Sequence, residues 1–156
     1  MLAKATILVP LLAALALAGP AVGAQAPRLS GSEASLLQAI NAARASHGVA
    51  PLRLDTRLFR AARSHTADML HRRYFAHGSV DGRARAAGAR GPVYGEDLAW
   101  STGLTPRWVV ASWLASPRHR AVLLRAGFRR IGIAISFGSF AGNPGAGIVT
   151  ADFAGR

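Results

Sequence analysis

The sequence predicts an α+β fold in which several helices precede a C-terminal pair of strands. Two observations support this prediction. Apolar residues recur at helical spacing through most of the chain after residue 31, and from Ile131 onward they alternate with small or polar residues, as in a strand. The length of 156 residues and a hydrophobic content of 51% suit one compact domain.

The first 24 residues have the features of a secretory signal peptide. Lys4 gives a positive start, residues 5–18 form an almost wholly apolar run, and Val22-Gly23-Ala24 offers small residues for cleavage. The run is short for a membrane span, and no later stretch is long and apolar enough to be one. We therefore expect a signal peptide at 1–24, a linker at 25–31 and a folded domain at 32–156, with no transmembrane segment after cleavage. The protein is then secreted or periplasmic.

Two helices are expected at the start of the domain. Ser32 can cap a helix over residues 33–47. Its apolar residues recur at helical spacing: Leu36, Leu37, Ile40 and Ala43. Residues 51–54 then form a short extended connection, and Asp55 caps a second helix that ends near Arg73.

In the middle of the domain, the residue pattern predicts a loop followed by two more helices. Residues 75–95 are rich in glycine and arginine and predict a long irregular loop with one short helical turn at residues 83–87. Compact domains usually keep a loop of this length for function. A helix is expected to begin at Pro106, and Ser116-Pro117 restarts the chain as a helix that runs to Ala126.

The C-terminal segment has the period of two strands. Inward and outward residues alternate in each: Ile131, Ile133, Ile135 and Phe137 in the first, and Ile148, Thr150 and Asp152 against Val149, Ala151 and Phe153 in the second. The glycine-rich residues 138–145 between them predict a turn. An antiparallel hairpin is therefore expected.

The chain is strongly cationic, with 19 Lys and Arg against 7 Asp and Glu and a net charge of +12. Such a charge would draw an exported domain toward an anionic cell-envelope polymer or lipid head groups. The arginines are scattered through every segment, so coding bias is an equal explanation, and no specific nucleic-acid binding is expected. The chain has no cysteine and therefore no disulfide. We expect a monomer.

The candidate chemical groups are two histidines and a carboxylate: His77, His119 and Glu96. Two neutral imidazoles and a carboxylate are the ligand set of an open zinc site. Arg118 and Arg120 flank His119, and their positive field favours a neutral imidazole but disfavours a cation beside it. We therefore expect weak or conditional binding of zinc or another divalent cation by His77 and His119, with no cofactor held permanently.

Other residues are weaker candidates. His65 and Asp68 lie three residues apart on the second helix and could form a hydrogen-bonded pair. The three tryptophans are expected in the core: Trp100, Trp108 and Trp113.

Short motifs follow one another in a fixed order along nearly the whole domain. They are Asn41 to Arg44, Leu54-Asp55, Tyr74 to His77, Asp81-Gly82, Gly95 to Ala99, Ser116 to Arg120 and Phe128 to Gly132. This set resembles the CAP superfamily of cysteine-rich secretory proteins, antigen 5 and pathogenesis-related 1 proteins, in its cysteine-free bacterial branch. The resemblance implies an α-β-α sandwich, in which a small, mainly antiparallel sheet is covered by helices on both faces.

The resemblance also implies a central groove with two histidines and up to two glutamates, where several family members bind a divalent metal such as zinc. His77 matches the first histidine and Glu96 matches the glutamate of a Gly-Glu-Asn motif. His119 matches the second histidine by its distance from Ile131.

The chain departs from the family pattern at two places. The other glutamate has no clear match, because Ala84 falls at about its place; Asp81, four residues after His77, is a possible substitute. Asp97 stands where the family usually has asparagine. Its extra charge either strengthens cation binding or makes a different hydrogen bond.

Two function classes follow. The preferred one is an exported, non-catalytic binding module whose groove holds a divalent metal or an envelope or lipid ligand. The alternative is a metal-dependent, peptidase-like hydrolase of the cell envelope or the exterior, in which Glu96 is the general base and His77 and His119 bind a metal that activates water. No Gly-x-Ser-x-Gly motif supports a serine nucleophile.

Overall fold

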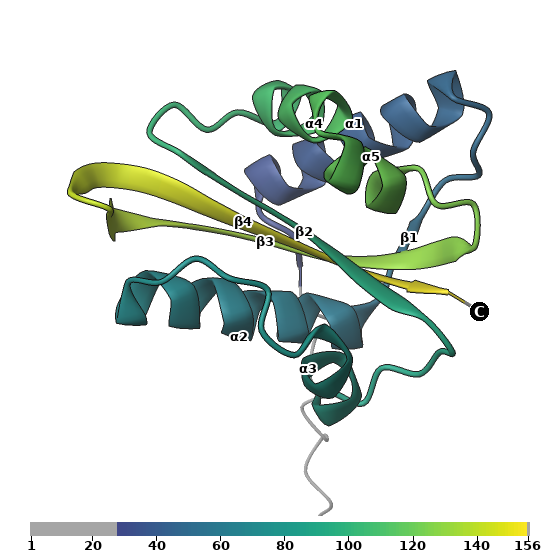
Figure 1. The fold of residues 1–156 in the computed structure, drawn as a ribbon, viewed down its shortest axis with the longest axis horizontal. Coiled ribbons are helices and arrows are strands. Elements are labelled where there is room, and N and C mark those ends of the chain that lie inside the picture. Colours follow the sequence, from purple (N-terminus) through teal and green to yellow (C-terminus); the bar gives the residue numbers. More distant parts are fainter. Residues whose placement is uncertain (1–27, 156) are drawn as a thin grey trace, which may run out of the picture.

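The computed structural model describes residues 28–155. A four-stranded sheet lies between two layers of helices (Figure 1). One face is covered by α1 (Gly31–Ser46), α4 (Pro106–Ala115) and α5 (Pro117–Leu123), and the other by α2 (Thr56–Arg72) and α3 (Val80–Ala86). The predicted α-β-α sandwich is confirmed.

The sheet has the strand order β1-β3-β4-β2. The strands are β1 (Arg53–Leu54), β2 (Tyr94–Ser101), β3 (Phe128–Phe140) and β4 (Asn143–Gly155). β4 pairs antiparallel with both β3 and β2, and only the two-residue β1 runs parallel to its neighbour. The predicted C-terminal hairpin is therefore confirmed, but its turn is tighter than expected. Ala141 and Gly142 form it with φ angles of 48° and 78°, so residues 138–140 of the expected turn belong to β3 and residues 143–145 to β4.

The first helix begins earlier than predicted. Its N-cap is Ser30 and not Ser32, because Glu33 stands three residues after Ser30 and completes a capping box. The Ser30 hydroxyl accepts from the Glu33 amide at 3.3 Å, and the Glu33 carboxylate accepts from the Ser30 amide at 2.7 Å. The signal peptide expected at 1–24, and residues 25–27 of the expected linker, lie outside the described residues.

The segment predicted as a loop over residues 75–95 holds more structure than expected. α3 begins at Val80, three residues before the predicted helical turn, and Ser79 caps it. β2 begins at Tyr94 and had no counterpart in the prediction. α5 ends at Leu123, before the predicted end at Ala126, while α2 is capped by Asp55 as predicted.

The main core lies between the sheet and the α1, α4 and α5 layer. Trp113 is buried there and donates its indole N–H to the Leu98 carbonyl at 2.9 Å. Trp108, also expected in the core, is 41% exposed. The buried Arg44 guanidinium donates to the carbonyls of Ala50, Leu123, Arg125 and Phe128, and so ties α1 to the loop between α5 and β3.

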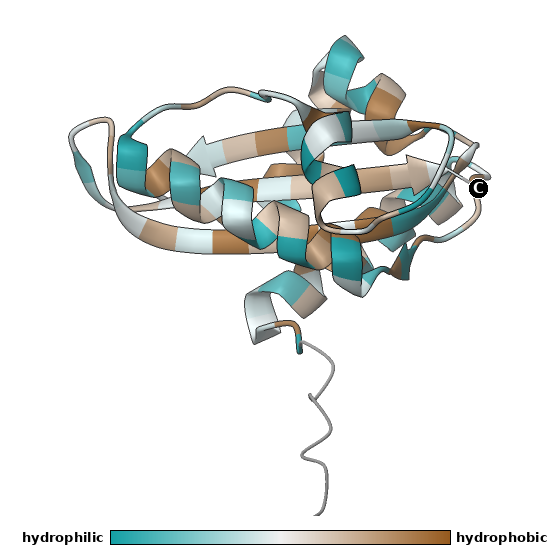
Figure 2. Cartoon of the chain, turned by 90° about the horizontal axis from the view of Figure 1, so that it is seen from below, coloured by the Kyte–Doolittle hydropathy of each residue, from teal (hydrophilic) through white to brown (hydrophobic). Residues whose placement is uncertain are grey.

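The opposite face of the sheet is covered mainly by α2. Figure 2 shows α2 lying across the strands, with hydrophilic and hydrophobic residues intermixed along its length. Its apolar side is buried, including Leu58, Phe59 and Met69. In the part of the chain that the structure describes, no helix is long and apolar enough to cross a membrane.

Candidate functional site

Glu96 and His77 form a hydrogen-bonded pair at the edge of the sheet. Glu96 comes from β2, and His77 from the segment that joins α2 to α3. His77 Nδ1 and Glu96 Oε1 share a hydrogen bond of 2.7 Å. The Glu96 side chain is fully buried, whereas that of His77 is 54% exposed. The pair therefore joins a fixed carboxyl group to a ring that solvent and ligands can reach.

Arg83 of α3 donates hydrogen bonds to both residues of this pair. Its guanidinium donates to Glu96 Oε2 and, at 3.2 Å, to Oδ1 of Asp152 on β4. It also donates to the His77 carbonyl at 3.1 Å. Since Glu96 and Asp152 are direct partners across β2 and β4, one guanidinium serves two adjacent buried carboxyl groups.

Burial favours the protonated form of the two carboxyl groups that share Arg83. Burial, together with the neighbouring Asp152, raises the pKa of Glu96 to about 9. Burial also raises the pKa of Asp152. The uncharged form of Glu96 is thereby favoured at pH 7.

The nearby histidines are uncharged. Burial lowers the pKa of His65 to about 4, and its Nε2–H donates to the Ala76 carbonyl at 3.0 Å. Burial, with the proximity of His119 and Arg83, lowers the pKa of His77. Burial lowers the pKa of His119 as well. His77 and His119 are therefore in the form that binds metals and accepts hydrogen bonds.

His77 and His119 line one pocket of about 260 Å³, together with Glu96, Asp97, Ser116, Arg118 and Val122. Four of the five groove residues expected from the sequence thus line a single pocket. The fifth, Asp81, is exposed and does not line it; Asp81 Oδ2 lies 3.8 Å from Arg85 Nη2. Asp81 therefore does not replace the missing glutamate. Ala84, at about the position of that glutamate, is buried in a small apolar cluster.

Asp97 is fully buried beside this pocket. Neither of its carboxyl oxygens has a hydrogen-bond partner among the described residues. Burial raises its pKa to about 8. Of the two alternatives that the sequence left open, the different hydrogen bond is absent between residues 28 and 155.

The residues around the pocket fit a metal ion only in part. Within residues 28–155, no group of three or more His, Cys, Asp and Glu side chains is arranged to hold one. Glu96 is already bonded through both oxygens, to His77 and Arg83. The side chains left at the pocket to hold a cation are the two imidazoles and the buried carboxyl group of Asp97, which has no partner among the described residues.

Sequence reasoning missed Arg83 and Asp152. Asp152 could have been noticed as a carboxylate in a strand of otherwise apolar and small residues. Nothing in the sequence distinguished Arg83 from the many other arginines. The suggested pair of His65 and Asp68 does not form, since Asp68 accepts from the Tyr74 hydroxyl at 2.6 Å and His65 bonds to Ala76.

Comparisons with known proteins find relatives over most of the chain. Residues 37–153 match the cysteine-rich secretory protein family, CAP. Two proteins of Bacillus subtilis align with 67% of the chain: the uncharacterized protein YkwD is 32% identical over 110 residues, and the uncharacterized membrane protein YlbC 30% over 109. The chain spans only 42% and 31% of their lengths.

Solved structures share the fold. An extracellular SCP-domain protein from Bacillus anthracis superposes with a TM-score of 0.65 at 22% identity, over 81% of this chain and 41% of that one. An outer surface protein from Borrelia burgdorferi does so with a TM-score of 0.65 at 21% identity, over 78% and 90% of the two chains. At such sequence identities, the structural similarity establishes the fold alone.

Proposed function

The chain belongs to the cysteine-rich secretory protein (CAP) family, and on that basis we propose that it is an exported domain that binds a ligand between His77 and His119. Export is supported by the signal-peptide features of residues 1–24 and by structural relatives described as extracellular or outer surface proteins. The proposal includes a monomeric domain at 32–156, with an anionic cell-envelope polymer or lipid as its partner.

The observation that carries the groove proposal is the set of neutral imidazoles on one pocket, one of them oriented by a buried carboxyl group. A carboxyl group behind an imidazole is the usual outer-shell arrangement at metal-binding histidines. His77 Nε2 makes no hydrogen bond to any described residue, so it is free to bind a ligand. A divalent cation bound there would offer a Lewis-acid site for an envelope ligand.

The positive surroundings favour weak and conditional cation binding. Arg118 lines the pocket and Arg83 lies behind Glu96, so two guanidinium groups stand close to the cation site. The two imidazoles and the buried carboxyl group of Asp97 make at most three protein ligands, whereas structural zinc sites use four. We therefore propose exchangeable binding of zinc or another divalent cation.

Zinc titration by calorimetry tests this proposal. We expect the wild-type protein to bind one zinc ion, and His77→Ala and His119→Ala each to bind at least about tenfold more weakly, as for loss of a ligand. His71→Ala is the matched control, because His71 is exposed at the end of α2 and does not line the pocket. If the wild-type protein bound no zinc, the proposal that the groove binds this cation would be wrong. An equal loss of zinc affinity in His71→Ala would contradict the assignment of the site to His77 and His119.

The hydrolase alternative is less well supported. A general base must reach the proton it takes, but both oxygens of Glu96 are bonded and its side chain is fully buried. Screening the protein against peptides and cell-wall fragments, with and without zinc, separates the two classes. Metal-dependent turnover that disappears in Glu96→Gln would favour the enzyme over the binding module.

A further inference from the structure

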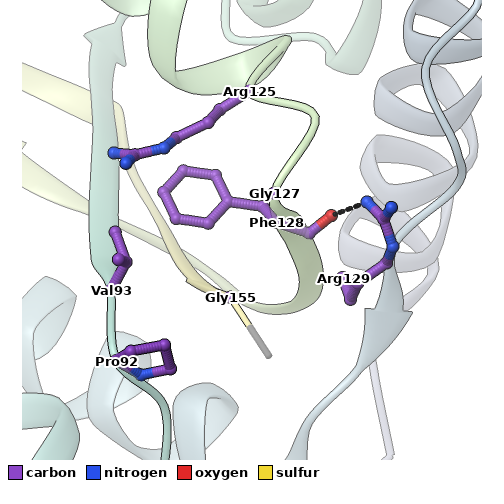
Figure 3. Close-up of a pocket in the computed structure, with 7 residues that line it drawn as sticks. All are labelled: Pro92, Val93, Arg125, Gly127, Phe128, Arg129 and Gly155. Atoms are coloured by element: carbon purple, nitrogen blue, oxygen red, sulfur yellow. Dashed lines mark hydrogen bonds between the residues drawn. The ribbon is translucent and has the colours of Figure 1, made fainter.

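A second concave region lies away from the groove, where β1 and β3 begin and β4 ends. It consists of two neighbouring pockets that share Arg129. The first, of about 310 Å³, has an apolar wall of Pro92, Val93 and Phe128 with Arg125 above it (Figure 3). The second, of about 430 Å³, is lined by Arg53 and Arg130 besides Arg129. Neither pocket is lined by a residue of the groove. We call this region the basic end.

The basic end carries uncompensated positive charge. Among the described residues, Arg53 and Arg125 are exposed and form no ion pair. The Arg129 guanidinium donates to the main-chain carbonyls of Ala126 and Phe128. Arg130 alone is paired, with Asp55 at 2.8 Å. No acidic residue from the described part of the chain lines either pocket, so the charged side chains that line them are all arginines.

The apolar wall is recessed. Phe128 is only 1% exposed, and its ring lies between the Arg125 guanidinium and Val93 (Figure 3). The guanidinium carbon of Arg125 is 5.3 Å from the centre of that ring. A flat lipid surface gains little from apolar atoms at the bottom of a pocket. A ring-shaped group with an apolar face and an anionic substituent can enter, contact Pro92 and Val93, and bond to Arg125.

The basic end is also held in a fixed shape. Three of the four hydrogen bonds of the buried Arg44, those to the carbonyls of Leu123, Arg125 and Phe128, fix the connection between α5 and β3, which carries Arg125. A fixed site loses less conformational entropy on binding.

From these features we propose that the basic end binds a polysaccharide of acidic sugars. A sugar ring supplies the apolar face, and its carboxylate supplies the partner for Arg125. Two adjoining pockets that share Arg129 suit successive units of a polymer better than one small anion. This inference rests on the proposed association with the cell envelope and names the chemical class of the partner.

Binding to polygalacturonate at physiological salt tests the inference, with neutral dextran as the uncharged polymer. The test variant is Arg53→Gln with Arg125→Gln. The control is Arg63→Gln with Arg107→Gln, which removes the same charge from exposed sites on α2 and α4. The control also matches the cation–π contact, since Arg63 lies 5.3 Å from the Phe59 ring. Melting curves verify that all variants are folded.

We expect the test variant to bind polygalacturonate at least about tenfold more weakly, and the control to change by less than about threefold, as for removal of distant surface charge. Three results would overturn the inference: no binding by the wild type, equal weakening in both variants, or tighter binding to phosphatidylglycerol vesicles than to the polysaccharide. The two sites can be tested independently of each other. We expect the test variant to keep zinc binding, and His77→Ala to keep polygalacturonate binding.

Discussion

At the scale of single residues, the most unusual feature is Asp97. A buried carboxyl group without a hydrogen-bond partner is costly when ionised, and neither oxygen of Asp97 has a partner among the described residues. An asparagine at position 97, usual in the family, would carry no charge. Asp97 therefore costs stability that an amide would not.

We predict that Asp97→Asn stabilises the protein increasingly as the pH rises. The folded pKa of Asp97 is about 8 and its ordinary value is 3.8, so the unfolded chain ionises first and wild-type stability falls between these two values. The amide variant lacks this loss. We expect a gain of up to about 5 kcal/mol at pH 8 and little at pH 4, measured by urea unfolding at both values.

The control for this prediction is Asp81→Asn, at an exposed carboxylate of α3. It removes the same charge from the surface and should change stability by less than about 0.5 kcal/mol at either pH. A gain in Asp97→Asn that is equal at both pH values would mean that Asp97 titrates normally, with the benefit coming from packing alone.

The sequence indicated the groove residues but not what holds them. His77, Glu96 and His119 stand in recognisable motifs, and the structure finds all three on one pocket. Arg83 and Asp152 became visible only in three dimensions. Their importance comes from the pairing of β2 with β4 and from the position of α3 beneath β2, which no local pattern encodes.

At the scale of elements, helices with clear caps were predictable and β2 was not. Asp55 marks the start of α2 through local hydrogen bonds to the amides of Arg57 and Leu58. β2 instead carries Glu96 and Asp97 side by side, which breaks the apolar alternation of a strand. Glu96 is tolerated there because it bonds to Arg83, whereas Asp97 is buried without a partner among the described residues. The alternation that predicts a strand is therefore absent at the residues of β2 that line the groove.

The contact between α2 and β3 depends on the absence of a side chain at Gly132. A methyl group there would overlap main-chain atoms of Leu58 and Phe59 on α2. We predict that Gly132→Ala destabilises the protein by about 3 kcal/mol or more, because a helix backbone must move to make room. Urea unfolding measures the change. If the variant is too unstable to purify, its soluble yield at low temperature replaces that measurement.

Gly103→Ala is the matched control, since a methyl group at Gly103 meets no atom within 4 Å. Gly103 lies in the turn after β2 and does not have a positive φ. We expect a change below about 0.5 kcal/mol there. Similar losses in both variants would mean that general glycine replacement, and not the approach of α2 to β3, sets the cost.

At the scale of the whole molecule, the fold makes the surface more cationic than the composition suggests. Four of the 7 acidic residues are buried: Glu33, Glu96, Asp97 and Asp152. The arginines are mostly exposed, Arg44 being the fully buried exception within residues 28–155. The sequence predicted the net charge, but the burial of its negative part follows from the sheet and its covering helices.

This separation of charge predicts that salt stabilises the protein. Exposed arginines repel one another, and the Debye length falls from about 30 Å at 0.01 M to about 8 Å at 0.15 M salt. The ion pair of Arg130 with Asp55 is partly buried and is screened less. We expect the melting temperature to rise by several degrees between these salt concentrations, and less in Arg63→Gln with Arg107→Gln. A fall instead would mean that the ion pairs, and not the repulsion between arginines, dominate the electrostatic free energy of folding.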